Sequence, residues 1–359
     1  MVHIIRKIKR LFALFIALIP LCAALSAPAY AAAAPSVSAK SAIMMSNGYP
    51  VYEKDADTPL PIASTTKLMT AILVIENCAL DERVDIKAEY CGIEGSSMYL
   101  AAGECYTVRE LLLGLLLVSG NDAAVALACH AAGDCAAFAA RMNDMAARLS
   151  MDSTHFTNPH GLYDKAHYST ARDMARLMEY CMDNPAFVEL DSAPSCDVGG
   201  KTLINHNRLL QACPGCIGGK TGFTEAAGRC LVSCCERDGA RLVCVTLGAQ
   251  DDWNDHMRLY SWAYSECSAR SVTDGVQFAV PLIAGDRRWA YLVPEGDASL
   301  FIPREAKVTL RAELPWFEFA PISAGARRGR VYVSVDEWPV LDYYLVYKET
   351  AETCFAGWN

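Results

Sequence analysis

The segment Ser64–Glu76 constrains the fold of this 359-residue chain more than any other. It reads Ser-Thr-Thr-Lys-Leu-Met-Thr-Ala-Ile-Leu-Val-Ile-Glu and is apolar on nearly every face beyond its first turn. Such a pattern is typical of a helix buried in the core of a domain. Pro61 stands just ahead of the segment, as at many helix starts. The sequence therefore predicts a core helix that carries Ser64 and Lys67 on its first turn.

Ser64 and Lys67 have the spacing of a nucleophile and its base. Residues three apart share one face of a helix, so the two side chains can lie side by side. A serine hydroxyl is a poor nucleophile until a neighbour takes its proton. Burial lowers the pKa of a lysine toward the range where its neutral amine can act as a base. Ser64 would also lie at the positive end of the helix, where developing negative charge is favoured.

Two further motifs follow, Ser119-Gly120-Asn121 and Lys220-Thr221-Gly222. Each motif alone is weak: a Ser-x-x-Lys helix start occurs by chance, Ser-Gly-Asn can simply end the apolar run Leu111–Val118, and Lys-Thr-Gly is a common strand-and-turn fragment. Together and in this order they match the motif trio of penicillin-binding proteins and class A β-lactamases, whose middle element is Ser-Asp-Asn. Their joint occurrence indicates serine acyl transfer.

With these motifs and their flanks, the chain resembles the D-alanyl-D-alanine carboxypeptidases, the low-molecular-mass penicillin-binding proteins. The resemblance covers about residues 36 to 350. It implies an α/β (α+β) catalytic domain of the β-lactamase/transpeptidase type with a small C-terminal all-β domain. The flanks that carry it are Pro61–Thr70, Gly95–Met98, Ser119–Ala128, Phe156–Leu162, Lys220–Thr224 and Ala227-Gly228.

The resemblance implies a catalytic role for each residue of the first two motifs. Ser64 would attack the carbonyl of the penultimate D-alanine and form an acyl-enzyme, with Lys67 as its base. Ser119 would pass a proton between Lys67 and the leaving amine. Asn121 would orient Lys67 or hold the backbone amide of the substrate.

The third motif would bind the substrate. Lys220 and Thr221 would hold its terminal carboxylate, and Gly222 would let the backbone approach closely. The N–H groups of Ser64 and Phe223 would form the oxyanion hole; the family often has histidine where Phe223 stands. The expected substrates are peptidoglycan stem peptides ending in D-Ala-D-Ala, and β-lactams would be acylating inhibitors. No cofactor and no metal are expected.

Three alternatives compete with this interpretation. A histidine-based hydrolase lacks support because no Gly-x-Ser-x-Gly elbow is present, and His160 is best interpreted as fixing a Pro-His-Gly turn. A class A-like β-lactamase needs a deacylating carboxylate between the second and third motifs, where Glu179 and Glu189 are the only glutamates. Asp173 and Glu179 are interpreted as solvated helix charges. A non-catalytic penicillin-binding sensor would share the acylation site.

The N-terminus predicts export. Four basic residues between Arg6 and Arg10 precede the apolar run Leu11–Ala24, and Ala29-Tyr30-Ala31 offers a cleavage site, so residues 1–31 are predicted to be a signal peptide. An uncleaved membrane anchor is the alternative. Removing these residues leaves 28 basic and 41 acidic residues, a net charge of −13, which argues against nucleic acid as a partner. The protein is expected outside the cytoplasm, in the cell wall, secreted or associated with the membrane.

The rest of the chain divides into two predicted domains. Residues 36–268 mix helical and strand-like runs, as expected for the catalytic domain, and residues 272–350 show only short strands. The 12 residues from Lys348 lack a cationic amphipathic stripe, so we expect the mature protein to be soluble. We expect most of the 15 cysteines after the signal to be free, buried thiols, and Cys213–Cys216 to be a turn with two thiols.

Overall fold

The computed structural model describes residues 33–354; the predicted signal peptide lies outside them. The helices are η1 (Ala63–Thr66), α2 (Lys67–Asn77), η2 (Ala88–Tyr90), α3 (Val108–Leu117), α4 (Asn121–Ala132), α5 (Cys135–Arg148), α6 (Ala171–Met182), α7 (Pro185–Asp191), α8 (Leu209–Ala212) and α9 (Asp252–Glu266). The strands are β1 (Ser41–Ser46), β2 (Tyr49–Lys54), β3 (Arg83–Asp85), β4 (Cys105–Thr107), β5 (Ser195–Val198), β6 (Lys201–Ile204), β7 (Cys216–Thr224), β8 (Gly228–Arg237), β9 (Ala240–Ala249), β10 (Cys267–Ser271), β11 (Phe278–Ile283), β12 (Trp289–Pro294), β13 (Ser299–Pro303), β14 (Val308–Glu313), β15 (Glu318–Phe319), β16 (Arg327–Val335) and β17 (Trp338–Tyr347).

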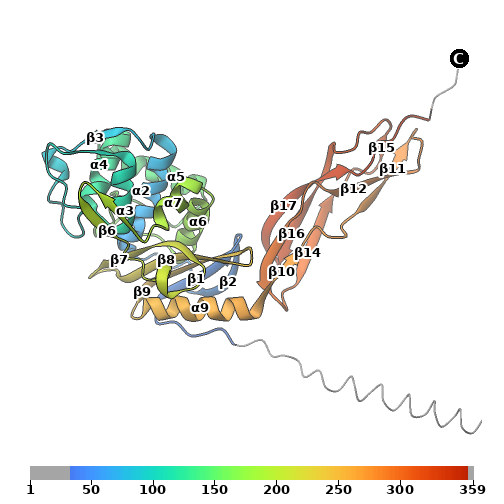
Figure 1. Cartoon of the computed structure of the whole chain (residues 1–359). Coiled ribbons are helices and arrows are strands. Elements are labelled where there is room, and N and C mark those ends of the chain that lie inside the picture. Colours follow the sequence, from blue (N-terminus) through green and yellow to red (C-terminus); the bar gives the residue numbers. More distant parts are fainter. Residues whose placement is uncertain (1–32, 355–359) are drawn as a thin grey trace, which may run out of the picture. The chain divides into compact units, whose positions relative to one another are not determined.

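A five-stranded antiparallel sheet, in the order β2-β1-β9-β8-β7, forms the centre of the catalytic domain. Helices α2 to α7 lie on one face of this sheet and α9 runs along the other (Figure 1). Side chains alternate between the two faces of a strand, so β8 needs apolar side chains on both faces to pack against both helical layers. Val232 and Cys234 join the core under the helices, whereas Leu231 and Cys235 join the core that contains Tyr260 of α9.

Local signals account for several of these elements. The sequence predicts a hairpin around Asn47-Gly48 whose second strand Pro50 confines to a sheet edge or a bulge, because proline has no backbone N–H. In the structure this turn joins β1 to the edge strand β2, and Pro50 pairs with Met45 beside a register shift. The sequence predicts a helix over Thr107–Val118 with Thr107 and Glu110 placed as a capping box, and this box opens α3 in the structure. The helix predicted from Ser64 is different in detail: Ser64 lies on the 3-10 turn η1, and α2 begins at Lys67.

The C-terminal part forms the predicted all-β domain. Six strands, in the order β14-β16-β17-β12-β11-β15, make one sheet, and β10 pairs with β13 in a second. The alternation of buried Val331, Val333 and Val335 along β16 gives this sheet its apolar face. The sequence predicts strands at Phe278–Leu282, Trp289–Val293, Lys307–Leu314, Arg330–Val335 and Val340–Tyr347, and five of the six strands coincide with these segments. The sequence does not predict β10, β13 and β15.

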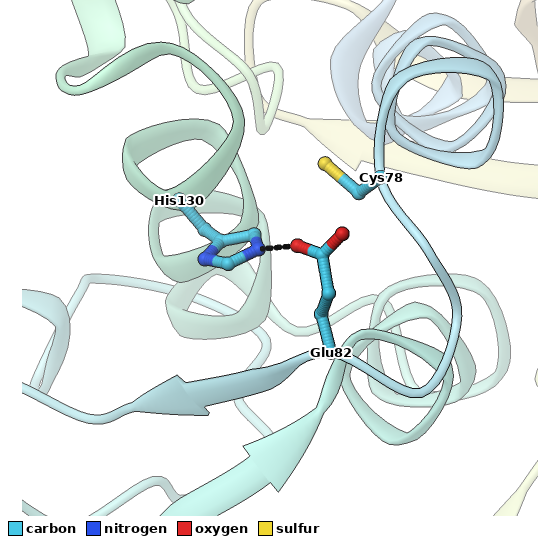
Figure 2. Close-up of side chains that lie close together, drawn as sticks. All are labelled: Cys78, Glu82 and His130. Atoms are coloured by element: carbon cyan, nitrogen blue, oxygen red, sulfur yellow. Dashed lines mark hydrogen bonds and ion pairs between the residues drawn. The ribbon is translucent and has the colours of Figure 1, made fainter.

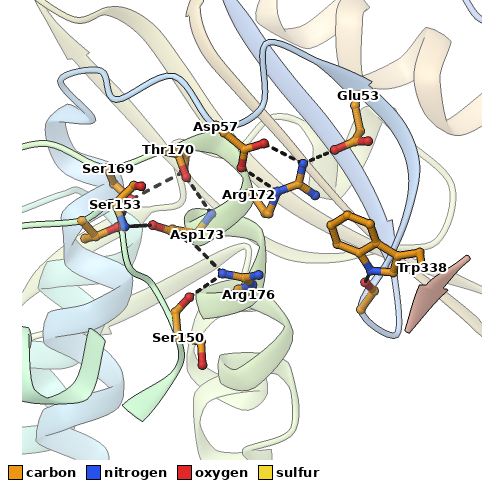
Figure 3. A network of polar contacts seen from close by, with 12 residues as sticks. Glu53, Asp57, Ser150, Ser153, Ser169, Thr170, Arg172, Asp173, Arg176 and Trp338 are labelled. Carbon is orange, nitrogen blue, oxygen red and sulfur yellow. Dashed lines mark hydrogen bonds and ion pairs between the residues drawn. The ribbon is translucent and has the colours of Figure 1, made fainter. Parts of the chain in front are cut away.

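A polar network on α6 holds the chain segment that leads to Ser64 (Figure 3). Arg172 donates two hydrogen bonds to Asp57, at 2.6 and 2.9 Å, and pairs with Glu53 of β2. Its guanidinium also lies 5.0 Å from the ring of Trp338 in β17. Close to this network, Leu60 and Ser169 form two backbone hydrogen bonds with each other, each N–H donating to the other residue's oxygen. Arg172 of α6 and Ser169 just before this helix thereby fix the chain between Asp57 and Leu60, which leads to the nucleophile.

Asp173 belongs to the same network, so its prediction as a solvated charge was wrong. The side chain is buried and accepts hydrogen bonds from the Ser153 N–H and the Thr154 hydroxyl. Its partners come from a loop some 20 residues away, which a helix pattern does not reveal.

Candidate active site

Ser64 and Lys67 lie next to each other, with 2.9 Å between Lys67 Nζ and Ser64 Oγ. The 3-10 turn presents Ser64 at the edge of a cavity, while Lys67 is fully buried. Burial is the main cause that lowers the pKa of Lys67 well below its usual value, and the nearby charge of Lys220 lowers it further. A lysine in this environment favours the neutral amine.

Two other acceptors surround the Lys67 amine. Its Nζ donates to Asn121 Oδ1 and to the His160 backbone oxygen, each at 2.7 Å. Asn121 Nδ2 donates to the Glu94 backbone oxygen, which fixes the orientation of the amide with its oxygen toward Lys67. The Pro-His-Gly turn thus contributes a backbone carbonyl to the site. Within the described residues, the His160 ring forms no hydrogen bond with Lys67.

Ser119 lies in the turn between α3 and α4 and lines the cavity with Ser64. Its φ of 62° places it in the left-handed region, and it is buried. The following Asp122 accepts hydrogen bonds from Ser97 Oγ and from the N–H groups of Met98 and Leu100. Asp122, which directly follows the second motif, therefore anchors the Gly95–Met98 loop, and both segments belong to the flanks that carry the family resemblance.

The third motif lies on β7, the strand at the end of the sheet beside η1. A Cβ on Gly222 would lie 3.0 Å from the Ser64 nitrogen, so glycine lets the two backbones approach closely. Thr221 and the exposed Phe223 line the cavity on this side. Of the predicted residues, Ser64, Ser119, Thr221, Gly222 and Phe223 line the cavity, and Lys67, Asn121 and Lys220 are buried.

Lys220 has an acidic neighbour that the sequence analysis did not identify. Burial lowers the pKa of Lys220 to about 8, and the charge of Asp191 opposes this shift. Asp191, at the end of α7, is completely buried and accepts a 2.6 Å hydrogen bond from the Gly219 N–H. Burial raises the pKa of Asp191 to about 7. A carboxylate thus lies behind the strand that carries Lys220.

The cavity has a volume of about 620 Å³ and includes residues that the motifs did not reveal. Arg208 and Arg229 add positive charge to its lining, and Arg229 pairs with Asp252 at 2.8 Å. They come from the loop before α8 and from β8, and no local motif distinguishes them from ordinary surface arginines. The other lining residues missed from the sequence are Pro194, Ile204, Asn205, His206, Asn207, Leu210, Gln211, Asp252 and Trp253.

Neither glutamate between the second and third motifs lines this cavity. Glu179 accepts a hydrogen bond from the Gly48 N–H in the β1–β2 turn, and burial raises its pKa to about 7. Its prediction as a solvated charge was therefore wrong. Glu189 is exposed and pairs with Arg109. Both glutamates have other partners, so the structure gives no support to a deacylating glutamate of the β-lactamase type.

Comparison with known proteins identifies the family. The profile of the D-alanyl-D-alanine carboxypeptidase family matches residues 28–251. D-alanyl-D-alanine carboxypeptidase DacB2 of Mycobacterium tuberculosis is 35% identical over 233 residues, 62% of this chain and 80% of the relative. D-alanyl-D-alanine carboxypeptidase DacC of Escherichia coli is 32% identical over 329 residues, 84% of this chain and 80% of the relative. The crystal structure of penicillin binding protein 5 from Haemophilus influenzae has a TM-score of 0.76 at 27% identity and covers 89% of this chain and 98% of its own.

The chain belongs to the D-alanyl-D-alanine carboxypeptidase family. It is a serine-type carboxypeptidase, and its fold is that of the penicillin-binding proteins, as the sequence predicted.

Proposed function

We propose that this enzyme is exported and removes the terminal D-alanine from peptidoglycan stem peptides through an acyl-enzyme on Ser64. The observation that carries the proposal is the set of contacts around the Lys67 amine. A neutral amine has two N–H donors and one lone pair. Asn121 Oδ1 and the His160 oxygen can only accept hydrogen bonds, whereas the Ser64 hydroxyl can donate. The lone pair of a neutral Lys67 would therefore point at the Ser64 proton.

The chemistry follows from this arrangement. Lys67 takes the hydroxyl proton as Ser64 Oγ bonds to the carbonyl carbon of the penultimate D-alanine. The N–H groups of Ser64 and Phe223 stabilise the oxyanion. The C–N bond then breaks, and Ser119 relays the proton from Lys67 to the leaving amine of D-alanine. Water hydrolyses the ester by the reverse proton path and restores the Ser64 hydroxyl.

Recognition of the substrate would rest on its free carboxylate. We assign this role to Lys220 and Thr221, which follow each other on β7 beside Ser64. A carboxypeptidase needs such a contact because the carboxylate marks the end of the chain that it trims. β-Lactams carry a carboxylate near their reactive carbonyl, so we expect them to acylate Ser64 and to inhibit the enzyme.

Export is part of the proposal and is supported by the sequence of residues 1–31. Cell-wall peptides lie outside the cytoplasmic membrane, so the substrate requires it. Within residues 33–354, no single helix has the length and apolar composition to cross a membrane; α4 and α5 meet that criterion only as a pair bent by 82°. Cell fractionation would test the proposal, and intact protein confined to the cytoplasm would contradict it.

The decisive experiment measures D-alanine release and covalent labelling together. The protein should release D-alanine from a peptide ending in D-Ala-D-Ala, and labelled penicillin should attach to Ser64. Ser64→Ala should abolish both, whereas Ser265→Ala, at an exposed position of α9, should change neither. A penicillin adduct mapped to another serine would refute the assignment. Rapid turnover of penicillin without D-alanine release would favour a β-lactamase instead.

A further inference from the structure

Three metal-ligating side chains lie together on the helical layer, outside the active-site cavity. One ligand atom each of Cys78, Glu82 and His130 lies within 4.8 Å of the other two. Cys78 caps the C-terminal end of α2, Glu82 stands just before β3, and His130 lies in the last turn of α4. Figure 2 shows the thiol, the carboxylate and the imidazole converging from these three places.

We propose that these residues bind a zinc ion. Thiolate, imidazole and a carboxylate oxygen are the ligands of Zn²⁺, whereas Mg²⁺ and Ca²⁺ take oxygen ligands. Glu82 and His130 are 47% and 23% exposed, so an ion can reach the site from solvent and water can fill a fourth position. Without a metal, Glu82 and His130 would simply form an ion pair. That pair does not explain why the thiol of Cys78 lies beside it, whereas a zinc site does.

The present separations require only small changes to form a tetrahedral site. His130 Nε2 and Glu82 Oε2 are 2.8 Å apart. With metal–nitrogen and metal–oxygen bonds of about 2.0 Å and a metal–sulfur bond of about 2.3 Å, ligand atoms lie roughly 3.3 to 3.6 Å apart. The pair must open by about 0.5 Å, and the thiol, which lies within 4.8 Å of the other two ligand atoms, must approach by about 1.3 Å at most. The Ala79 N–H already holds the other oxygen of Glu82 at 2.9 Å, which orients the carboxylate.

The surrounding charges favour a cation. Two helices, α2 and α4, end at this point, and the C-terminal end of a helix carries partial negative charge. The thiolate and the carboxylate add two negative charges when the ion is bound. Arg141 contributes an opposing positive charge nearby, and its Nη1 donates to the Ala131 backbone oxygen at 2.8 Å.

The position of the site gives the ion a structural role. The same two helices begin at the active site: Lys67 is the first residue of α2 and Asn121 the first of α4, and their side chains share a 2.7 Å hydrogen bond. A metal joining Cys78 to His130 would clamp the opposite ends of these helices. It would therefore hold the two helices that carry the base and its amide partner in a fixed relation, without taking part in the reaction.

The test measures zinc binding directly on the full-length protein, kept reduced and stripped of metal. Titration against a chromophoric chelator should show one Zn²⁺ per chain, and Co²⁺ should give a thiolate charge-transfer absorption band. Cys78→Ser, Glu82→Gln and His130→Gln should each weaken binding at least about tenfold. Added zinc should raise the Tm of the wild type and not that of these variants.

Cys196→Ser and His155→Gln are the matched controls, because both residues lie outside the cluster. Each control should bind zinc as the wild type does. Glu82→Gln changes an exposed side chain to one of equal size, so penicillin labelling at Ser64 should report that this variant is folded. The proposal is wrong if each of the three single variants binds zinc as tightly as the wild type, or if the wild type shows no saturable zinc binding.

Discussion

Replacing Gly161 by alanine tests whether the Pro-His-Gly turn sets the position of the nucleophile. Gly161 has φ of 86°, and a Cβ there would lie 2.0 Å from the Ala63 backbone oxygen, where real contacts are not shorter than 3.0 Å. The backbone beside Ser64 would have to move by about 1 Å. A misplacement of about 1 Å can cost about 100-fold in rate, so acylation should slow by that order. The left-handed conformation should cost about 1–2 kcal/mol and overpacking about 1–3 kcal/mol more.

Gly103→Ala is the matched control for this substitution. Gly103 has φ of 91°, and its added Cβ would meet no atom within 4 Å. It should therefore lose about 1–2 kcal/mol of stability through its backbone conformation alone and keep full activity. The assays are the second-order rate constant for penicillin acylation, the rate of D-alanine release, and thermal unfolding. If Gly161→Ala acylates within about twofold of the wild-type rate, the turn does not position Ser64 and the reasoning fails.

Three further predictions concern charge, capping and thiols. Because burial lowers the pKa of Lys220 to about 8, its positive charge is lost above that pH, and kcat/KM for a D-Ala-D-Ala peptide should fall about tenfold per pH unit there. An acyl donor without a carboxylate should lack this decline, and an identical decline would contradict the role of Lys220. Thr107→Ala removes the α3 cap and should cost about 1 kcal/mol in thermal unfolding; an unchanged Tm would show that the cap is unimportant. The 15 cysteines of residues 33–354 are all free thiols, so reductant should leave the Tm unchanged, whereas each native bridge lost would cost about 2–5 kcal/mol.

The elements that the sequence predicted well have strong local signals. The sequence predicts a helix over Ala171–Met182, and α6 spans these residues, where an apolar stripe follows the capping residue Thr170. Helix α9 was not predicted: its buried apolar residues Leu259, Tyr260 and Ala263 form only a narrow stripe among polar and aromatic side chains. Helix α4 was also missed, because its small residues and its Ser-Gly-Asn start resemble a turn as much as a helix.

The active-site residues also divide into those that local sequence patterns predict and those that only the tertiary fold brings together. Motif residues could be predicted because each motif is a short stretch of chain whose residues stay close together in the local structure, which is a helical turn for Ser64 and Lys67, the turn before α4 for Ser119 and Asn121, and the strand β7 for the third motif. The lining arginines Arg208 and Arg229 could not, because only the tertiary fold brings their segments to the cavity. The same reason explains the errors at Asp173 and Glu179. Their partners are a loop and a β-turn that contact α6 in space but are distant in sequence.

The two buried lysines show why motif chemistry depends on residues outside the motifs. The same residue type serves as base at Lys67 and as carboxylate-binding cation at Lys220, and burial lowers the pKa of both. In the structure, the charge of Lys220 adds to the lowering at Lys67 while the charge of Asp122 opposes it, and the charge of Asp191 opposes the lowering at Lys220. The repulsion from Lys220 therefore favours a neutral Lys67, and Asp191 at the end of α7 favours the charged form of Lys220, the combination that the proposed mechanism requires at one pH. Asp191 carries no motif, so part of the difference between the two lysines comes from a residue that only the fold reveals.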